Sequence, residues 1–393
     1  MKLFPSIFGF LRRYSIALIL LAVATLAYGW QVARLGFYWD DWVFVGRYQS
    51  MGVFNTIFYG GTRQLGVLTL LPGFLLAGDS PLAWHIYSLL LRWAVGLLFW
   101  WVLEQLWPGQ RTAITLMAAL FIVHPAFSQQ SIAVVYSLQL LDYAIFLLSI
   151  GLMVKAERAG SQANIPASER GRRWLWLVLA ILAQALHLFI VEYFVGLELI
   201  RPLVLYLLQK ETTSALPGKL LRLKNALIRW LPYLLVLIVY AVWRSGVLGG
   251  GFDTYEYKTI TAFLRTDPRA AILELIEYGL KDILVLLVNT WQGTLAPSII
   301  DLSQPYNFFS LGIAALAAFG LYYILSRPWF DPAFQVGQVG ENPRDGQFLR
   351  QAAALGFFAV LVSFIPSWFV RRHIVEPGNF GDRFALAGLF GAS

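Results

Sequence analysis

Apolar runs of about 20 residues recur along this chain, and they restrict its fold more than any other feature, because a helix of that length crosses the roughly 30 Å hydrocarbon core of a bilayer. Charged residues make up only 13% of the 393 residues, against about 25% in a typical soluble domain. The short alternating segments of a membrane β-barrel are absent. The sequence therefore predicts an all-α fold, a polytopic transmembrane helical bundle of about 9–11 spans.

The expected spans follow the apolar runs. They lie at 14–33, 84–106, 112–123, 138–155, 174–190, 193–208, 230–247, 308–326 and 351–370. The segment 271–291 carries several charged residues in its first half, which favours an amphipathic helix in the membrane interface over a span. The last apolar stretch, 384–393, is too short to cross a bilayer, so we expect a truncated part of a longer protein that ends inside a helix.

The Lys and Arg residues indicate an orientation. More than half of the 30 such residues lie in the N-terminal segment and in the loops 107–111, 155–173, 209–229 and 327–350. The positive-inside rule places short basic loops in the cytoplasm. We therefore expect a multi-pass protein of the cell membrane, with a cytoplasmic N-terminus and a single membrane domain covering residues 1–393.

Two long loops fall on the opposite, external side in this arrangement, at 34–83 and 248–307. Loops of this length are usually functional or disordered. The first is rich in Trp, Tyr, Phe and Gly and lacks the low hydrophobicity and high charge of disordered segments. We expect it to be folded against the membrane surface.

Several classes of function are excluded or disfavoured. The chain has no cysteine, which rules out disulfides, thiolate metal sites and cysteine nucleophiles. Walker, HExxH and Gly-x-Ser-x-Gly motifs are also missing. The net charge of +8 comes from basic residues scattered through loops, so the expected partner is the lipid bilayer and not a nucleic acid.

Ionisable residues gather at one level of the predicted topology, near the external ends of the spans. They are His85, His124, His187, His373, Asp142 and Glu192. Ionisable groups at membrane depth cost a few kcal/mol and tend to mark sites or water-filled cavities. A catalytic or transport site on the external face would need such a layer. The alternative is that interfacial positions simply tolerate these residue types.

An acidic pair, Asp40 and Asp41, follows the first predicted span within the segment 37–42, which reads FYWDDW. Adjacent carboxylates repel each other, so the pKa of one tends to rise. Such a pair can supply a general base and oxygen ligands for a divalent cation, Mg²⁺ or Mn²⁺. The alternative is a solvated turn flanked by the interfacial aromatics Trp39 and Trp42.

This acidic pair, placed directly after the first transmembrane helix in a long external loop, resembles the signature of the GT-C superfamily of membrane glycosyltransferases. That superfamily includes the protein O-mannosyltransferases and the aminoarabinose transferases of lipid A. The His124-Pro125 step and the later Asp142 are similar to a segment of the O-mannosyltransferase-like branch.

Two further positions carry the resemblance. Glu192 lies between the fifth and sixth spans, where relatives often have a Lys-Glu pair, and Arg383 is similar to a late arginine that contacts the donor phosphate. The departures are Val191 in place of the lysine, and Gln129 with Gln130 where an acidic residue is common.

The resemblance implies transfer of a sugar from a polyprenyl-phosphate donor to an unknown acceptor on the non-cytoplasmic face. It assigns catalysis to Asp40, Asp41, His124 and Glu192. A divalent cation, Mg or Mn, would bind at the acidic pair. The donor phosphate would meet guanidinium groups, which match its oxygens in a bidentate manner; the candidates are Arg383, Arg371, Arg372, Arg63 and Arg92. The substrate cavity would be lined by Trp39, Trp42, His85, Asp142 and His187.

Each of these arginines has an alternative role as an interfacial side chain that keeps its charged end in water. Arg92 lies well inside the second predicted span, where a charge needs a partner, and we expect that partner to be Glu192.

Other functions stay open. A secondary transporter or channel for a polar solute tends to show internal repeats, broken helices and charges at the membrane midplane. A non-catalytic lipid or glycan assembly protein, a phosphotransferase acting on lipid headgroups, and a polymerase or ligase of lipid-linked glycans are further candidates. The sequence leaves the sugar and the acceptor unidentified.

Overall fold

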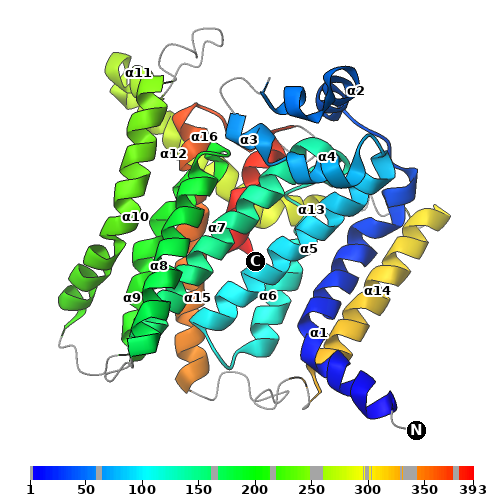
Figure 1. Ribbon diagram of the computed structural model, residues 1–393, viewed down its shortest axis with the longest axis horizontal. Coiled ribbons are helices and arrows are strands. Elements are labelled where there is room, and N and C mark those ends of the chain that lie inside the picture. The colour runs from blue at the N-terminus through cyan, green and yellow to red at the C-terminus, as the bar shows by residue number, and fades with distance from the viewer. Residues whose placement is uncertain are drawn as a thin grey trace.

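The computed structural model describes residues 3–58, 64–160, 167–212, 218–247, 260–294, 296, 301, 303–327, 330, 343–374 and 380–393. Every regular element in this part of the chain is a helix. The long helices lie side by side as a bundle, with the N-terminus at one end and the short helices α2, α3 and α4 at the other (Figure 1). We call the end that carries α2 to α4 the distal end.

The elements have the following bounds. They are α1 (Leu3–Tyr28), η1 (Gly29–Arg34), α2 (Asp41–Phe58), α3 (Gln64–Leu68), α4 (Leu71–Ala77), α5 (Pro81–Leu106), α6 (Arg111–Val123), η3 (Gln129–Ser131), α7 (Ala133–Gly160), α8 (Ala167–Leu188), η4 (Glu192–Leu199), α9 (Ile200–Thr212), α10 (Lys219–Val247), α11 (Ile260–Thr266), α12 (Pro268–Leu284), η5 (Val285–Asn289), α13 (Thr290–Thr294), α14 (Pro305–Leu325), α15 (Pro343–Ser363), α16 (Ile365–Phe369), η6 (Phe380–Phe384) and α17 (Ala385–Ala392).

Six of the described helices are long and apolar enough to cross a bilayer. They cover Tyr14–Arg34, Pro81–Leu106, Ala133–Gly160, Lys219–Arg244, Asn307–Leu325 and Asp345–Phe369. These six helices confirm the prediction of an all-helical chain with several potential membrane spans. The spans expected at 112–123 and 174–190 fall in α6 and α8, which are not among the six.

The span expected at 193–208 is wrong as a single helix. The chain forms the 3₁₀ segment η4 before α9 begins at Ile200. Gly196 of η4 lies so close to the Val362 carbonyl of α15 that a side chain at this position would collide with backbone. This stretch packs closely against α15 and buries the Glu198 side chain, and its backbone is a 3₁₀ helix and not a regular α-helix.

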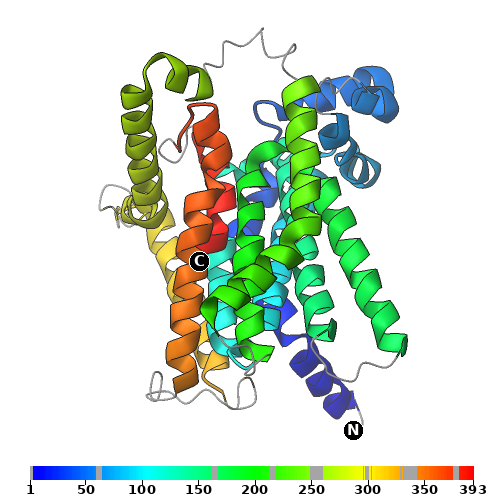
Figure 2. The same cartoon turned by 90° about the vertical axis from the view of Figure 1, so that its left-hand side faces the viewer.

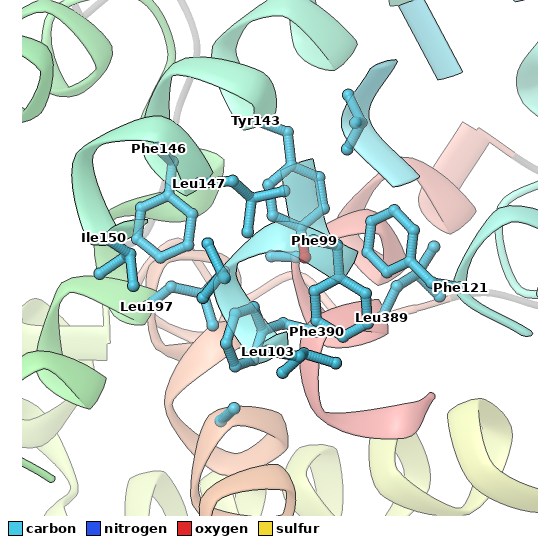
Figure 3. Packing of buried hydrophobic residues seen from close by; sticks show 14 of the residues in the cluster. Phe99, Leu103, Phe121, Tyr143, Phe146, Leu147, Ile150, Leu197, Leu389 and Phe390 are labelled. Carbon is cyan, nitrogen blue, oxygen red and sulfur yellow. The ribbon is translucent and has the colours of Figure 1, made fainter. Parts of the chain in front are cut away.

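The helix α7 occupies the centre of the bundle and packs mainly against α5 and α8. In its apolar window 72% of the residues are buried, whereas the share is 6% in α14, which lies at the periphery beside α1 (Figure 1). Figure 3 shows Tyr143 and Phe146 of α7 pointing into the cluster that contains Phe99 and Phe390. The ring of Phe390 lies 5.3 Å from that of Phe99, so α17 completes the core.

The described part of the first long loop is helical and packed. Its own small core contains Val45, Leu70, Phe74 and Trp84, and the Trp84 indole donates to the Gly78 carbonyl at 2.8 Å. The loop is folded at the distal end, as the composition predicts.

The helix expected at 271–291 consists of α12, the π-turn η5 and α13, and it is not among the six long apolar helices. It is amphipathic: Ile272, Ile276 and Leu280 are more than half exposed, whereas Asp282 is fully buried. In Figure 2, α12 runs beside the bundle, roughly parallel to the long helices, and not across their ends as a helix lying in the membrane interface would. Asp282 accepts hydrogen bonds from the Trp368 indole and the Ile374 amide, at 2.6 and 2.7 Å, which join α12 to the segment after α16.

A first prediction concerns the contact between α15 and α17. Gly356 and Gly391 approach so closely that a side chain at either one meets the backbone of the other. We expect Gly356→Leu to destabilise the detergent-solubilised protein by about 2 kcal/mol or more through overpacking, seen as a lower unfolding midpoint in a thermal scan. Gly320→Leu in α14 is the control, because nothing lies within 4 Å of that position. An equal midpoint for both variants would contradict the contact.

Candidate functional site

Several of the predicted site residues that the structure describes lie in or against the first half of α7 or the loop 124–132 that precedes it. The helix α6 has 13 residues, about 20 Å of helix, and therefore ends short of the thickness of a bilayer core. Non-helical backbone at such depth occurs only where it is buried in protein or lines a water-filled cavity. The loop 124–132 is therefore the first place to look for a site.

Asp41 is fully buried and caps α7 from a distant part of the sequence. Its Oδ1 accepts hydrogen bonds from the amides of Val134 and Val135, at 3.0 and 2.9 Å. A carboxylate here satisfies free amides of the first turn and lies at the positive end of the helix dipole. Burial raises the pKa of Asp41 to about 7, although these amides oppose the rise. Its Oδ2 has no hydrogen-bond partner among the described residues.

Asp40 lies in a different environment from its neighbour. It is exposed at the distal end, as are Trp39 and Trp42, with 67% and 57% of their surface accessible. Trp39 adopts a positive φ of 49°, a left-handed conformation that is uncommon for a non-glycine residue. The acidic pair therefore places one carboxylate inside the protein and the other in contact with the outside.

The described residues contain no group of three or more His, Asp or Glu side chains that could hold a metal ion. Asp41 directs one oxygen at backbone amides, while Asp40 is exposed. Within the described residues, the acidic pair therefore offers one exposed carboxylate and one buried oxygen, Oδ2 of Asp41.

His124 ends α6 and is fully buried. Its Nδ1 accepts from the Ala126 amide at 3.2 Å, and its ring makes an edge contact with Trp291 of α13 at 5.1 Å. Burial, with a smaller effect from the charge of Arg92, lowers the pKa of His124 to about 4. The ring is therefore neutral at pH 7 with its proton on Nε2, and this donor has no partner among the described residues.

Arg92 holds the end of α6 in place, and its expected partner was wrong. Its Nε donates to the Ile122 carbonyl at 2.7 Å and its Nη1 to Gln130 at 3.2 Å, while the guanidinium lies over the Tyr28 ring at 4.3 Å. Glu192 instead pairs with Arg244 of α10 at 3.5 Å. The reason is spatial: Arg92 lies near the end of α6 and the loop 124–132, where the Ile122 carbonyl and the Gln130 side chain accept its hydrogen bonds.

Asp382 of η6 ties the C-terminal part of the chain to the same loop. Its carboxylate accepts from the amide and hydroxyl of Ser128, at 3.1 and 2.6 Å, and from the Gln129 amide at 2.8 Å. Burial raises the pKa of Asp382 while these bonds oppose the rise. The Gln129 side chain thus has a carboxylate partner, which comes from residue 382.

Arg383 follows this anchor. Its guanidinium reaches the Tyr136 side chain of α7 and lies 5.0 Å from the centre of the Phe384 ring. Its Nε has no partner among the described residues. His124 begins the loop 124–132, Arg92 of α5 bonds Gln130 within it, and Arg383 follows Asp382 of η6, which bonds Ser128 and Gln129.

Asp142 and His187 lie deeper in the core and have no accessible surface. They belong to a chain of buried ionisable groups that continues to Glu198 and Arg201. Glu192 is partly exposed, pairs with Arg244 and acts electrostatically on Asp142.

The remaining candidates serve other contacts. His85 is buried and its Nε2 lies 2.9 Å from the Gly36 carbonyl. The Nε and Nη2 of Arg371 each donate to the Glu274 carboxylate at 2.7 Å. The centre of the His373 ring lies 5.0 Å from that of Tyr278. These contacts, with Arg372 beside them in sequence, join α12 to the segment after α16. Arg63 lies outside the described residues.

Sequence reasoning missed Asp382 and Glu198 as organising residues. Glu198 is an acid inside an apolar run, which is a recognisable signal. Asp382 had no signal beyond its position beside Arg383. Comparison with known proteins adds no assignment, because no family model, curated protein or solved structure matches the chain.

A second prediction concerns Asp41. Its pKa of about 7 in the folded protein exceeds the ordinary value of 3.8, so the native state binds the extra proton. The stability from this group is complete below about pH 4 and is lost as the pH rises through 7. We expect Asp41→Asn, which can still accept both amide bonds, to flatten the decline of the unfolding midpoint between about pH 4 and 8.

Asp40→Asn is the matched control and should keep the decline of the wild type. Asp41→Ala should lower the midpoint at every pH, since loss of a helix cap costs about 1–2 kcal/mol. A wild-type decline that survives in Asp41→Asn would contradict the assigned role.

Proposed function

We propose that this protein is a membrane glycosyltransferase that moves a sugar from a polyprenyl-phosphate donor to an acceptor at the distal end, which faces away from the cytoplasm. The observation that carries the proposal is the set of donors around the loop 124–132. Arg92 and Arg383 have no carboxylate partner within the described residues, and the Nε2 of buried His124 has no acceptor. A phosphate would supply the missing negative charge and oxygens.

Burial makes this arrangement informative. A guanidinium such as that of Arg92, with only 2% of its surface accessible, is costly to keep without a counter-charge. Two neutral oxygens, the Ile122 carbonyl and the Gln130 side-chain amide, accept hydrogen bonds from Arg92 but do not balance its charge. An anionic ligand at the loop would supply the counter-charge. The lipid tail of a polyprenyl phosphate would lie in the bilayer beside the bundle.

The acidic pair supports the acceptor half of the reaction. Asp41 fixes the start of α2 to the start of α7 and so holds Asp40 at the exposed edge. Asp40 takes the proton of an acceptor hydroxyl, and the oxygen bonds to the anomeric carbon. The bond from that carbon to the phosphate oxygen breaks. The charge that develops on the leaving phosphate is stabilised by Arg383, Arg92 and the His124 N–H, as preorganised donors do in other enzymes.

One observation favours the alternative of a secondary transporter. The chain is interrupted between α8 and α9 by η4, and fully buried charges lie beside this interruption. Broken helices with internal charges are typical of transporters. The donor-turnover experiment below separates the two functions.

The third prediction concerns turnover. Purified protein in nanodiscs should release polyprenyl phosphate from a polyprenyl-phosphate hexose. We expect Asp40→Asn to slow this release by about 100-fold or more, because a positioned general base contributes at least that factor. Asp79→Asn, an exposed carboxylate at the same end, is the control with wild-type turnover. Full activity of both Asp40→Asn and Asp41→Asn would remove the acidic pair from the mechanism.

The fourth prediction concerns the phosphate. Arg383→Gln should weaken the binding of polyprenyl phosphate by about tenfold or more, since a charge-assisted bond to phosphate is lost, as measured by quenching of tryptophan fluorescence. Arg371→Gln is the matched control, because the Nε and Nη2 of Arg371 already donate to Glu274. Equal affinity of Arg383→Gln and the wild type would place the phosphate elsewhere.

A further inference from the structure

Four ionisable side chains form a continuous buried chain between α7, α8, η4 and α9. They are Asp142, His187, Glu198 and Arg201, and none has accessible surface. The proposed transfer reaction uses none of them. The four side chains differ in how many of their polar atoms have a hydrogen-bond partner.

The inner half of the chain is complete. Glu198 accepts from the Nε and Nη2 of Arg201, at 2.6 and 2.7 Å, and from the Gln184 amide at 2.5 Å. The Nη2 of Arg201 also donates to Ser149 at 3.0 Å. The opposite charges of Glu198 and Arg201 cancel. This pair therefore adds no net charge to the core.

The outer half is incomplete. Neither oxygen of Asp142 has a hydrogen-bond partner among the described residues, and the same holds for the Nδ1 of His187. These two groups face each other, with Nδ1 3.9 Å from Oδ1 of Asp142. The Nε2 of His187 lies 2.9 Å from Glu198 and donates to it, which leaves a lone pair on Nδ1 in the neutral ring.

Charge balance identifies what is missing. With Glu198 and Arg201 cancelled, an ionised Asp142 beside a neutral His187 leaves one uncompensated negative charge and three unpartnered acceptor atoms in the core. A buried charge or acceptor in that state is strongly unfavourable. A single proton, on Oδ1 of Asp142 or on Nδ1 of His187, removes the net charge and supplies a donor.

We propose that Asp142 and His187 form a buried binding site for one proton, reached from the distal end through Glu192. The side chain of Glu192 is 27% exposed and pairs with Arg244, and its charge acts on Asp142. A proton passes from water to the Glu192 carboxylate and then to the Asp142–His187 site, where either Asp142 or His187 holds it, because 3.9 Å between Oδ1 and Nδ1 is longer than a hydrogen bond. Release reverses these transfers, and no other reactant takes part.

Charged and polar groups reach the site from several neighbouring elements. Glu198 of η4 bonds His187, and Gln184 of α8 and Arg201 of α9 bond Glu198. Tyr233 and Arg244 of α10 lie against Arg201 and Glu192, respectively. His187 bonds Glu198, which lies next to the junction between η4 and α9. Binding of the proton therefore changes the charge beside a stretch that is not regular α-helix. It stands independently of the proposed glycosyl transfer.

The test uses the four histidines of the full chain. Protein labelled with ¹⁵N-histidine in nanodiscs gives four ring signals, and His187→Gln identifies that of His187. Infrared spectra report a protonated carboxyl separately. At neutral pH we expect either an imidazolium signal at His187 or a carboxylic-acid band, and its loss in Asp142→Asn. A neutral His187 without an Asp142-dependent acid band at any pH where the protein is folded would overturn the proposal.

Two further variants keep the result interpretable. His85→Gln removes a buried histidine that bonds Gly36 and should leave the Asp142-dependent signal unchanged. Glu192→Gln should slow the response to a pH jump by at least about tenfold, because a positioned proton carrier is lost, with the same final spectrum. A response to Na⁺ at constant pH instead of to the proton would contradict the assignment of the ligand.

Discussion

The start of α7 sets the arrangement of the distal end. A helix whose first turn lies inside a protein presents amides that need acceptors, and Asp41 supplies one oxygen to two of them. Because Asp41 is also the first residue of α2, this bond fixes α2 above α7. Asp40, one residue earlier, is thereby held at the surface. Two adjacent carboxylates consequently have different environments, and a raised pKa belongs to the buried one.

The same requirement explains the loop 124–132. Its polar groups, and the last carbonyls of α6 before it, are met by side chains of other segments. Arg92 and Tyr28 bond the Ile122 carbonyl, and Asp382 bonds the Ser128 amide. These contacts come from α1, α5 and η6, which are far apart in sequence. The donors left over after these bonds, on Arg92, Arg383 and His124, are what favours an anionic ligand here.

Residue patterns within one segment predicted the positions of the long helices. The predicted contact between side chains of different segments was wrong. The apolar runs located the long helices because span length follows from bilayer thickness. The pairing of Arg92 with Glu192 failed because both residues found acceptors or donors nearer in space. The Gln129 side chain bonds a carboxylate that comes from residue 382. The sequence alone carries no signal for such a contact between distant segments.

The helix α7 also joins the two parts of the molecule that carry ionisable groups. Val134, which bonds Asp41, and Asp142 are about 12 Å apart along one helix axis. A helix buried on most of its surface moves as a unit, since packed interiors transmit displacement and do not absorb it. A change of charge at Asp142 that shifts α7 against α8 would therefore also shift its capped first turn. The 3₁₀ stretch η4 contains Glu198 and packs against α15. It therefore connects the buried charges to α15 through backbone that is not regular α-helix.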